Sequence, residues 1–390
     1  MSNDASVRNE NRERGFCPSC GRYIGAADIC PYCGARVHKR IDMKYIKALA
    51  LIVAIVGTIL FVVGTSYISP PSIKISQINQ QMNYARVKLS GTVISSSSFN
   101  EDSESLSFTI SDGTKNELFD IDSIRVTVYS PTSKELVQMG KLPVSGDSVE
   151  IVGQIKIRET PYIIVSYSDD VIIHRDTPQE VNFDQIINSW QDYLGSAVII
   201  DGWISEYVDY GDYAICSLRD YNYPDNDLSL YIPQPAKTLT GALANFFVGD
   251  LVRVIGNLWE YNNQPEIVPW NASSILIIEK LQLWTLSEVM SNQELYTSQR
   301  RIVKLNLTLV EPPYYSSSGA GVSLNVSDSS VGLTKYLKVW IWARVWDDIP
   351  DDIKENITLG RTLLVVGELQ EYAGTLELII DAANWILGVY

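Results

Sequence analysis

Cysteine is scarce in this chain and unevenly placed. Four of the five cysteines stand close together near the N-terminus: Cys17, Cys20, Cys30 and Cys33. The sequence after them contains only Cys216, so an intramolecular disulfide framework is excluded for that part of the chain. Cys216 lies in an alternating apolar run, and we expect a buried small hydrophobic side chain there rather than a nucleophile.

Residues and motifs that serve catalysis are also scarce. His38 and His174 are the only histidines, and the sequence has no Gly-rich phosphate loop, nucleophile elbow or His-Glu metal helix. Adjacent acids such as Asp347 and Asp348 do not indicate a catalytic pair, because neighbouring strand residues point to opposite faces and charges in turns are solvated. We therefore expect a protein that is not an enzyme.

Positive charge is rare over much of the chain, whose formal net charge is −15. From residue 181 to 279 the only basic residues are Arg219, Lys237 and Arg253, whereas residues 1 to 47 are basic on balance. Nucleic-acid affinity comes largely from Lys and Arg side chains that neutralise phosphates. The composition of the long C-terminal part therefore opposes nucleic-acid binding, although acidic surface alone also serves solubility.

The chain has one long hydrophobic run. Ala48–Gly64 has Thr58 as its only polar side chain, and no charge occurs between Lys47 and Lys74. We predict a transmembrane helix over residues 45–68, roughly 36 Å long, which is enough to cross a hydrocarbon core of about 30 Å. The alternatives are a buried helix of a soluble protein, for which the run is too apolar on all sides, and a cleaved signal peptide, for which it is too long.

Basic residues beside this run predict its orientation. Five precede it and only Lys74 follows it closely; the five are Arg36, Lys39, Arg40, Lys44 and Lys47. By the positive-inside rule, the N-terminus is expected in the cytoplasm and the long C-terminal part outside the cell. The chain is thus expected at the cell membrane, with the lipid bilayer as a partner of its single span.

Two Cys-x-x-Cys turns form a paired motif near the N-terminus. Cys17-Pro-Ser-Cys20-Gly21 and Cys30-Pro-Tyr-Cys33-Gly34 are separated by eight residues. Two such turns complete a closed tetrahedral Cys₄ site suited to structural Zn²⁺, whereas redox Cys-x-x-Cys motifs come singly. The motif resembles the short zinc ribbons at the N-termini of many archaeal and bacterial proteins. We assign residues 16–37 to this ribbon and residues 1–15 to a disordered tail.

One pattern occurs three times after residue 72, which indicates a tandem repeat. Its anchor is a pair of glycines that encloses an apolar run: Gly146–Gly153, Gly249–Gly256 and Gly360–Gly367. Each copy begins with a short helical start: Ile75–Ile78, Phe183–Ile186 and Leu286–Val289. The second and third starts carry capping boxes, formed by Asn182 with Gln185 and by Thr285 with Glu288.

Each copy is interpreted as a helical turn, three alternating strands, a connection and two further strands. The connection is expected to be helical at Pro235–Phe247 in the second copy and at Asp351–Ile357 in the third. Five strands with glycines at the bends describe a small Greek-key barrel with its own core. The predicted fold is therefore mainly β, with barrels over residues 73–175, 180–280 and 283–390. Tandem immunoglobulin-like sandwiches are the structural alternative, disfavoured because seven strands per copy are hard to find.

These repeats resemble the OB-fold, in particular the archaeal nucleic-acid-binding kind related to replication protein A and to tRNA anticodon-binding domains. The third copy departs from the pattern, with Asn306 in place of the first-strand glycine and Arg361 in place of the aspartate after the first anchor glycine. The resemblance implies an exposed sheet face that takes an oligonucleotide, an oligosaccharide or a protein.

Candidate ligand-binding residues are of two kinds. A basic strip in the first barrel would consist of Arg86, Lys88, Arg158 and Lys156, and aromatic platforms would use Trp203, Trp259, Trp340 and Trp342. Because the charge is unfavourable for phosphate, we expect a glycan, an envelope component or a protein as partner. Binding of single-stranded nucleic acid is the alternative.

Overall fold

The structure, a computed structural model, describes residues 15–36 except 18 and 26, residues 43–66, and residues 69–390 except 101, 212, 234–245 and 333–334. Its contacts divide the chain into two units, Met1–Ser69 and Pro70–Tyr390. Several expectations fall outside the described residues: the tail before residue 15, His38, Lys39 and Arg40, the end of the predicted span at 67–68, and most of the connection at 235–247.

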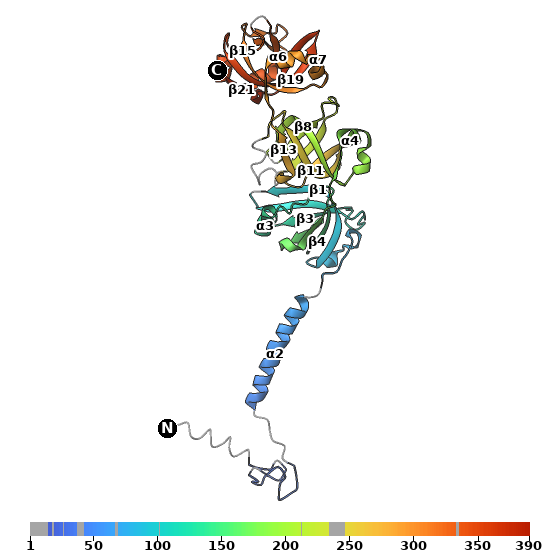
Figure 1. Cartoon of the computed structure of the whole chain (residues 1–390). Coiled ribbons are helices and arrows are strands. Elements are labelled where there is room, and N and C mark those ends of the chain that lie inside the picture. Colours follow the sequence, from blue (N-terminus) through green and yellow to red (C-terminus); the bar gives the residue numbers. More distant parts are fainter. Residues whose placement is uncertain are drawn as a thin grey trace, which may run out of the picture. The chain divides into compact units, whose positions relative to one another are not determined.

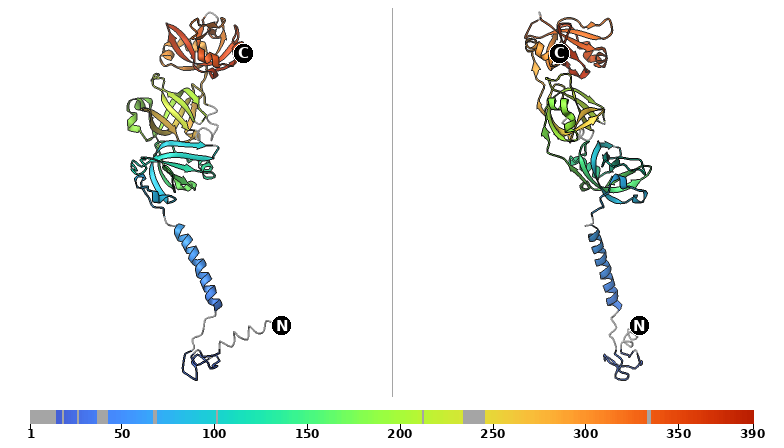
Figure 2. Two further views of the ribbon diagram at one scale, coloured as in Figure 1. Left: turned by 180° about the vertical axis from the view of Figure 1, so that it is seen from behind. Right: turned by 90° about the vertical axis from the view of Figure 1, so that its right-hand side faces the viewer.

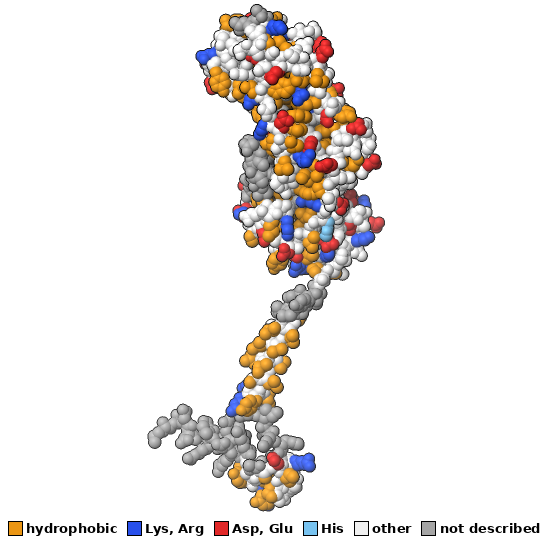
Figure 3. All heavy atoms as spheres, viewed as in Figure 1, with side chains coloured by type: hydrophobic (Ala, Val, Ile, Leu, Met, Phe, Trp, Pro, Cys, Tyr) orange, Lys and Arg blue, Asp and Glu red, His pale blue; other side chains and the backbone are white. Residues whose placement is uncertain are grey.

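A single helix, α2 (Met43–Ser66), carries the hydrophobic run of the first unit (Figure 1). Its segment Lys44–Phe61 is long and apolar enough to cross a membrane, and the side chains of that segment are all exposed. Figure 3 shows them as a column of apolar side chains with basic residues at one end. No other helix of the described residues passes this test of length and composition.

The second unit contains three closed five-stranded barrels, whose strands curve around their cores in both views of Figure 2. Barrel 1 consists of β1 (Arg86–Asn100), β2 (Ser105–Ser111), β3 (Ile124–Val128), β4 (Ser148–Ile157) and β5 (Pro161–Val165). Barrel 2 consists of β8 (Ala197–Asp209), β9 (Tyr213–Arg219), β10 (Leu228–Pro233), β11 (Leu251–Tyr261) and β12 (Gln264–Pro269). Barrel 3 consists of β15 (Ile302–Leu309), β17 (Gly321–Ser327), β18 (Leu337–Trp342), β19 (Thr362–Tyr372) and β20 (Thr375–Ile380).

The three barrels share one topology. In barrel 1 the strands pair in the order β1-β2-β3-β5-β4, and β4 pairs back onto β1 to close the barrel. The pairing of the third strand with the fifth is parallel in every barrel, and the other pairings around the barrels are antiparallel. A short additional strand pairs with the fourth strand of each barrel: β6 (Val171–His174), β13 (Ile275–Glu279) and β21 (Ile386–Val389). The predicted fold class, mainly β with three barrels, is confirmed.

Short helices begin each barrel and connect its third and fourth strands. The starts are η1 (Ile75–Gln77) with η2 (Gln80–Met82), α4 (Phe183–Ser189) with η4 (Trp190–Tyr193), and α6 (Leu286–Ser291) with α7 (Gln293–Ser298). Both predicted capping boxes are present. The connections contain α3 (Thr132–Gln138) in barrel 1, and α8 (Ala343–Asp348) with the predicted α9 (Asp351–Asn356) in barrel 3. The remaining elements are η3 (Ser168–Asp170), η6 (Ala272–Ser274), η7 (Ala383–Trp385), β7 (Gln179–Glu180), β14 (Leu283–Trp284) and β16 (Tyr314–Tyr315).

Steric constraints require glycine at both anchor positions. The first glycine of each pair has a positive φ, 90° at Gly146, 89° at Gly249 and 84° at Gly360, which other residues rarely adopt. A Cβ on the second glycine would lie 2.7 Å from a backbone oxygen of the next strand at Gly153 and 2.8 Å at Gly367. The fourth and fifth strands therefore approach too closely for any side chain at that position.

The register corrects one expectation about the third copy. Gly91 pairs with Val149, and Gly202 pairs with the equivalent Val252. The residue that pairs with the equivalent Leu363 is Leu307, so Asn306 does not occupy the glycine position. Leu307 is completely buried. In the third barrel the first strand thus carries a core side chain where the other two carry glycine.

The expectation of an independent core for each barrel is only partly right. Barrel 1 has its own cluster of buried apolar residues. The buried apolar residues of barrels 2 and 3 form one continuous cluster, which extends from Val181 to Ile386 and includes Ile302 at the junction. Barrels 2 and 3 are therefore expected to unfold together.

The aspartate after the first anchor glycine connects a barrel to the segment that follows it. Asp147 accepts hydrogen bonds from Arg175 Nε at 2.8 Å and Nη2 at 2.7 Å, and Asp250 accepts from Lys280 Nζ at 2.8 Å. Both basic residues lie just after the additional strand of their barrel. Arg361 makes the same backbone turn, with its N–H donating to the Thr358 oxygen at 3.0 Å, but it provides no such carboxylate. The aspartate therefore has two roles: it connects the barrel to the following segment, and it closes its own turn by accepting from the N–H of Val144 at 2.9 Å or of Phe247 at 3.0 Å.

Candidate metal centre and candidate binding faces

The two Cys-x-x-Cys turns have the same local structure. The N–H of Gly21 donates to the Cys17 oxygen at 2.8 Å, and the N–H of Gly34 donates to the Cys30 oxygen at 2.9 Å. Both glycines have a positive φ, 68° and 70°. The glycine that follows each Cys-x-x-Cys motif, Gly21 or Gly34, therefore closes its turn.

The four cysteine sulfurs converge on one point. All four Sγ atoms lie within 4.8 Å of one another, with 3.6 Å between Cys17 and Cys33 and 3.6 Å between Cys20 and Cys30. The thiols titrate together: the backbone N–H of Cys20 lowers the pKa of Cys17 to about 6, whereas at Cys33 the backbone N–H of Ala35 opposes a rise in pKa that the hydrogen bond with Cys30 produces. The predicted cluster of Cys17, Cys20, Cys30 and Cys33 could therefore hold a metal ion.

The predicted basic strip of barrel 1 is largely neutralised. Arg86 forms an ion pair with Asp170 at 2.9 Å, and Lys88 forms one with Glu150 at 2.6 Å. Lys88 in turn lowers the pKa of Glu150 through its hydrogen bond. Figure 3 accordingly shows basic and acidic side chains interspersed on the visible face of barrel 1.

The other two residues of that strip lie at the end of β4. Lys156 Nζ lies 3.5 Å from the centroid of the Tyr84 ring. Arg158 is exposed in the loop between β4 and β5. The structure thus leaves one corner of the barrel basic and does not produce a continuous positive groove along β1 and β4.

Trp203 lies at the junction of barrels 2 and 3 rather than on an open face. Its ring stacks on Tyr221 with centroids 5.0 Å apart. The Arg301 guanidinium lies 5.8 Å from the Trp203 ring and 4.8 Å from the Tyr221 ring, and it also approaches Trp284 and Tyr296, each at 5.2 Å. A cavity of about 420 Å³ borders these rings. Four aromatic rings around one guanidinium are a stable packing arrangement, so we interpret Trp203 as a junction residue.

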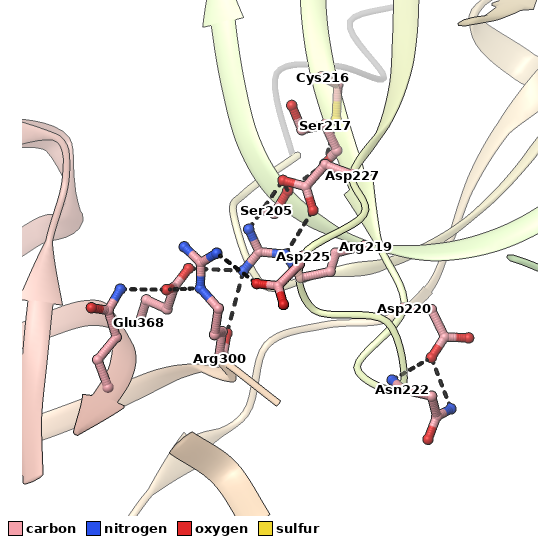
Figure 4. Close-up of polar contacts among 11 residues, drawn as sticks. Ser205, Cys216, Ser217, Arg219, Asp220, Asn222, Asp225, Asp227, Arg300 and Glu368 are labelled. Atoms are coloured by element: carbon pink, nitrogen blue, oxygen red, sulfur yellow. Dashed lines mark hydrogen bonds and ion pairs between the residues drawn. The ribbon is translucent and has the colours of Figure 1, made fainter. Parts of the chain in front are cut away.

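A buried ion-pair network lies at the same junction. Arg219 Nη1 is 2.8 Å from Glu368 Oε2 of barrel 3, and Arg219 Nε is 2.7 Å from Asp227 Oδ1. Arg300 Nε binds the other oxygen of Glu368 at 2.7 Å, and Figure 4 shows both arginines converging on this carboxylate. Burial opposes the charge of Arg219, but its hydrogen bonds to Asp227 and Glu368 raise its pKa above the ordinary value.

The junction of barrels 1 and 2 uses the equivalent position. Asn257 follows the second anchor glycine of barrel 2, as Glu368 does in barrel 3. Its Nδ2 donates to Asp147 Oδ1 at 2.9 Å and to the Ser145 oxygen at 3.1 Å, while Trp270 Nε1 donates to its Oδ1 at 2.8 Å. One position of the fourth strand therefore connects each of these barrels to the preceding one.

Trp259 lies on an aromatic and acidic face of barrel 2. It pairs across the sheet with Glu266, a mostly buried carboxylate. On the same face, Tyr213 is 5.5 Å from Tyr231 between ring centroids, and Tyr210 stacks on Tyr213 at 4.9 Å. We call this surface of Glu266, Trp259, Tyr213 and Tyr231 the barrel 2 face.

Trp340 and Trp342 lie on the corresponding surface of barrel 3. Their rings meet edge to face with centroids 5.8 Å apart. Lys338 Nζ lies 2.6 Å from Glu377 Oε1 and 5.6 Å from the Trp340 ring centroid. We call the surface of Lys338, Trp340, Trp342 and Glu377 the barrel 3 face. Both faces include the third strand, beside which OB barrels take their ligands.

Sequence reasoning missed the buried carboxylates of these faces. Glu266 and Glu377 each follow the second anchor glycine of their copy by ten residues, and each directly precedes or interrupts an apolar run of its strand. That recurrent spacing is a signal that the sequence offered. It also missed Glu368, for which no local pattern indicates a partner as distant as Arg219.

No family model and no curated protein sequence matches this chain. Among solved structures it is similar to the OBody AM1L10 bound to hen egg-white lysozyme, with 24% identity over 27% of this chain and 99% of that chain and a TM-score of 0.22. It is also similar to a chain of a replication protein A heterotrimer bound to single-stranded DNA, with 10% identity over 79% and 95% and a TM-score of 0.24. A third similar structure is the p204 HINb domain, with 10% identity over 49% and 93% and a TM-score of 0.23. The strand pairing itself defines three OB-like barrels, which follow an apolar helix and a four-cysteine cluster in the chain.

Proposed function

We propose that this chain is a membrane-anchored, non-enzymatic binding protein that presents its barrels outside the membrane to a glycan, an envelope component or a protein. The observation that carries this proposal is the chemistry of the barrel 2 and barrel 3 faces. Each combines aromatic rings with a buried carboxylate, Glu266 or Glu377. Aromatic rings stack on sugars and side chains, whereas neither face offers an unpaired cation for a phosphate backbone, because Lys338 is bound to Glu377 and the described part of the barrel 2 face carries no Lys or Arg.

The helix α2 supports the anchor. Its apolar side chains are exposed along Lys44–Phe61, for example Leu49 at 63% and Phe61 at 71%. Leaving so much apolar surface in water is unfavourable by about 25 cal/mol per Å², and a bilayer removes that cost. Lys44 and Lys47 at its N-terminal end support a cytoplasmic N-terminus.

The four-cysteine cluster supports a structural zinc ion. Zn–S bonds of about 2.3 Å in a tetrahedron place sulfurs about 3.8 Å apart, close to the 3.6 Å between Cys17 and Cys33. Four thiolate ligands leave no open position for water or substrate. Such an ion would hold the ribbon together and would supply no catalysis.

A membrane-anchored protein that binds single-stranded nucleic acid is the alternative. The corner of barrel 1 formed by Lys156 and Arg158 favours it. The ion pairs of Arg86 with Asp170 and of Lys88 with Glu150 oppose it, because each pair must break before its basic side chain can neutralise a phosphate.

The test compares ligands on one protein and its variants. Full-length protein in detergent is titrated with solubilised envelope polysaccharide, with envelope proteins and with single-stranded DNA. We expect binding of an envelope fraction that weakens about 5- to 150-fold in Tyr231→Ala or Trp340→Ala, if the ligand packs on these rings as strongly as a base does, at about 1–3 kcal/mol per ring. Arg86→Ala serves as the matched control with little effect. Tight DNA binding that Arg86→Ala weakens, with no envelope binding, would refute the proposal.

A further inference from the structure

The barrel 2 and barrel 3 faces carry a carboxylate at the same structural position. Glu266 on β12 pairs in parallel with Ser229 on β10, and Glu377 on β20 pairs in parallel with Lys338 on β18. The two glutamates are 8% and 5% exposed. The two barrels therefore offer an internal comparison: both keep the carboxylate, its partner on the third strand changes from Lys338 to Ser229, and the neighbouring rings change from Trp340 to Tyr231 and, on the fourth strand, from Gln370 to Trp259.

Barrel 3 shows how its carboxylate is stabilised. The Lys338 ammonium binds Glu377 Oε1 at 2.6 Å and faces the Trp340 ring, whose centroid is 5.6 Å away. A buried carboxylate is costly unless a cation pairs with it. The Lys338 side chain thus stabilises the buried carboxylate of Glu377 with a primary ammonium group, which lies between that carboxylate and an aromatic ring.

Barrel 2 keeps the carboxylate and the aromatic ring but not the lysine. Tyr231 follows Ser229 by two residues, as Trp340 follows Lys338, so it occupies the same position on the strand. Glu266 Oε2 receives only the Ser229 hydroxyl, at 3.3 Å, and no Lys or Arg of the described part of the chain pairs with it. Burial raises the pKa of Glu266 to about 7, which reflects the missing cation.

We propose that Glu266 and Tyr231 form a binding site for the primary ammonium group of a lysine side chain on a protein partner. The inference rests on the proposed function, in which the barrels bind a partner outside the membrane. Lys338 indicates the chemistry: an ammonium at the end of an unbranched alkyl stem, 2.6 Å from the carboxylate and 5.6 Å from the centroid of the Trp340 ring. An amino sugar carries its ammonium directly on a ring and has no such stem.

The aromatic surroundings fit the same ligand. Tyr213 lies 5.5 Å from Tyr231, and Tyr210 extends the stack by a further 4.9 Å. Tyr231 and Tyr213 are half-buried. Rings of this kind attract an ammonium through cation–π interactions and cover an alkyl stem with apolar surface.

The test uses the full-length protein in detergent and the probe N-acetyl-lysine methylamide. Carboxyl ¹³C NMR follows the titration of Glu266, and calorimetry measures the affinity. We expect the probe to bind once per chain and to lower the pKa of Glu266. Glucosamine and the norleucine analogue of the probe are expected to bind at least about tenfold more weakly.

Two variants use the internal comparison. Ser229→Lys places the barrel 3 lysine in barrel 2, so it should lower the pKa of Glu266 by itself and abolish probe binding. Lys338→Ser should raise the stoichiometry from one probe to two. Glu266→Gln, nearly isosteric, should abolish probe binding while the fold is retained.

The inference is overturned if the wild-type protein does not bind the probe, if glucosamine binds more tightly, or if Glu266→Gln binds the probe as the wild type does. These outcomes differ from failure of the proposed function. An envelope ligand that binds independently of Glu266 would refute only the lysine site. Tight DNA binding through the basic corner would refute the proposed function instead.

Discussion

Arg219 of barrel 2 and Glu368 of barrel 3 form an ion pair at 2.8 Å in which both side chains are only 7% exposed. The two residues are 149 positions apart in the sequence, and their pair lies beside the apolar cluster that barrels 2 and 3 share. The two barrels are thus joined by both a common core and a desolvated charge pair. This relationship makes their coupling testable.

Glu368→Ala is expected to destabilise barrels 2 and 3 together. Breaking a buried pair on one side costs about 3–5 kcal/mol when the remaining charge is unpaired; we expect a loss at or below the lower end of that range, because Arg219 keeps two hydrogen bonds to Asp227. Chemical denaturation followed by tryptophan fluorescence measures the loss. The matched control is Asp201→Ala, which breaks the exposed pair with Arg253 (side chains 40% and 42% exposed) and should cost less than about 1 kcal/mol.

A double variant separates charge from packing. Arg219→Met with Glu368→Leu removes both charges of the pair and leaves Asp227, which is 33% exposed and can be hydrated; we expect it to recover much of the lost stability, because apolar replacement of a buried pair is often neutral. If the double variant is as unstable as Glu368→Ala, the instability of Glu368→Ala does not come from the unpaired charge of Arg219.

Glu266 gives a pH-dependent prediction. Its pKa in the folded protein, about 7, lies above the ordinary value of 4.5, so the folded state binds the proton more tightly than the unfolded state. Stability from this group is therefore fully present below pH 4.5 and is lost as the pH rises through 7. At pH 8 Glu266→Gln should be more stable than the wild type by up to about 3 kcal/mol.

The check is urea denaturation of both proteins between pH 4.5 and 8. The difference between them should shrink to roughly 0.4 kcal/mol at pH 4.5, where Glu266 is protonated in the folded state and about half protonated in the unfolded state. A difference that stays constant with pH would show that Glu266 does not titrate as its burial indicates.

Replacing Cys17 and Cys30 with Ser is expected to abolish stoichiometric zinc, because only two of the four thiolates remain. The barrels should keep their stability, since they belong to a separate compact unit. Elemental analysis and thermal denaturation give the two readouts. Cys216→Ala, a buried cysteine outside the cluster, is the matched control and should retain one zinc. Barrels that melt together with the metal site would contradict the separation of the units.

Protease added to intact cells is expected to digest the barrels and to leave the N-terminal ribbon intact. The reason is the excess of basic residues before α2, which keeps that side in the cytoplasm. An antibody against each end of the chain reads the result, and a cytoplasmic protein serves as the control for lysis. Barrels that resist the protease until the cells are lysed would reverse the orientation.

Local patterns in the sequence predicted much of the fold. The paired glycines located the fourth strand of every barrel because a positive φ and a close strand approach admit no other residue. The capping boxes located the helical starts because their hydrogen bonds span only three residues. The cysteine spacing likewise located the four-sulfur cluster, since each turn is closed locally.

Long-range pairing could not be predicted in the same way. Ser229 meets Glu266 through the parallel pairing of β10 with β12, and Glu368 meets Arg219 across a junction between barrels. Neither contact corresponds to a local or periodic pattern in the sequence. Trp203 was predicted as part of a ligand platform, but its position at the junction depends on where barrel 3 packs. The roles of Trp259, Trp340 and Trp342 in ligand binding stay predictions.

The central claim is that the barrels bind a partner other than nucleic acid, and fluorescence anisotropy with labelled single-stranded DNA tests it most directly. The protein is titrated at physiological salt and again at low salt. We predict binding no tighter than the non-specific range of roughly 10⁻⁴ to 10⁻⁶ M, with a shallow salt dependence, because few free cations face the phosphates. Sub-micromolar binding that is lost when Arg86, Lys88, Lys156 and Arg158 are changed to Glu would contradict the account.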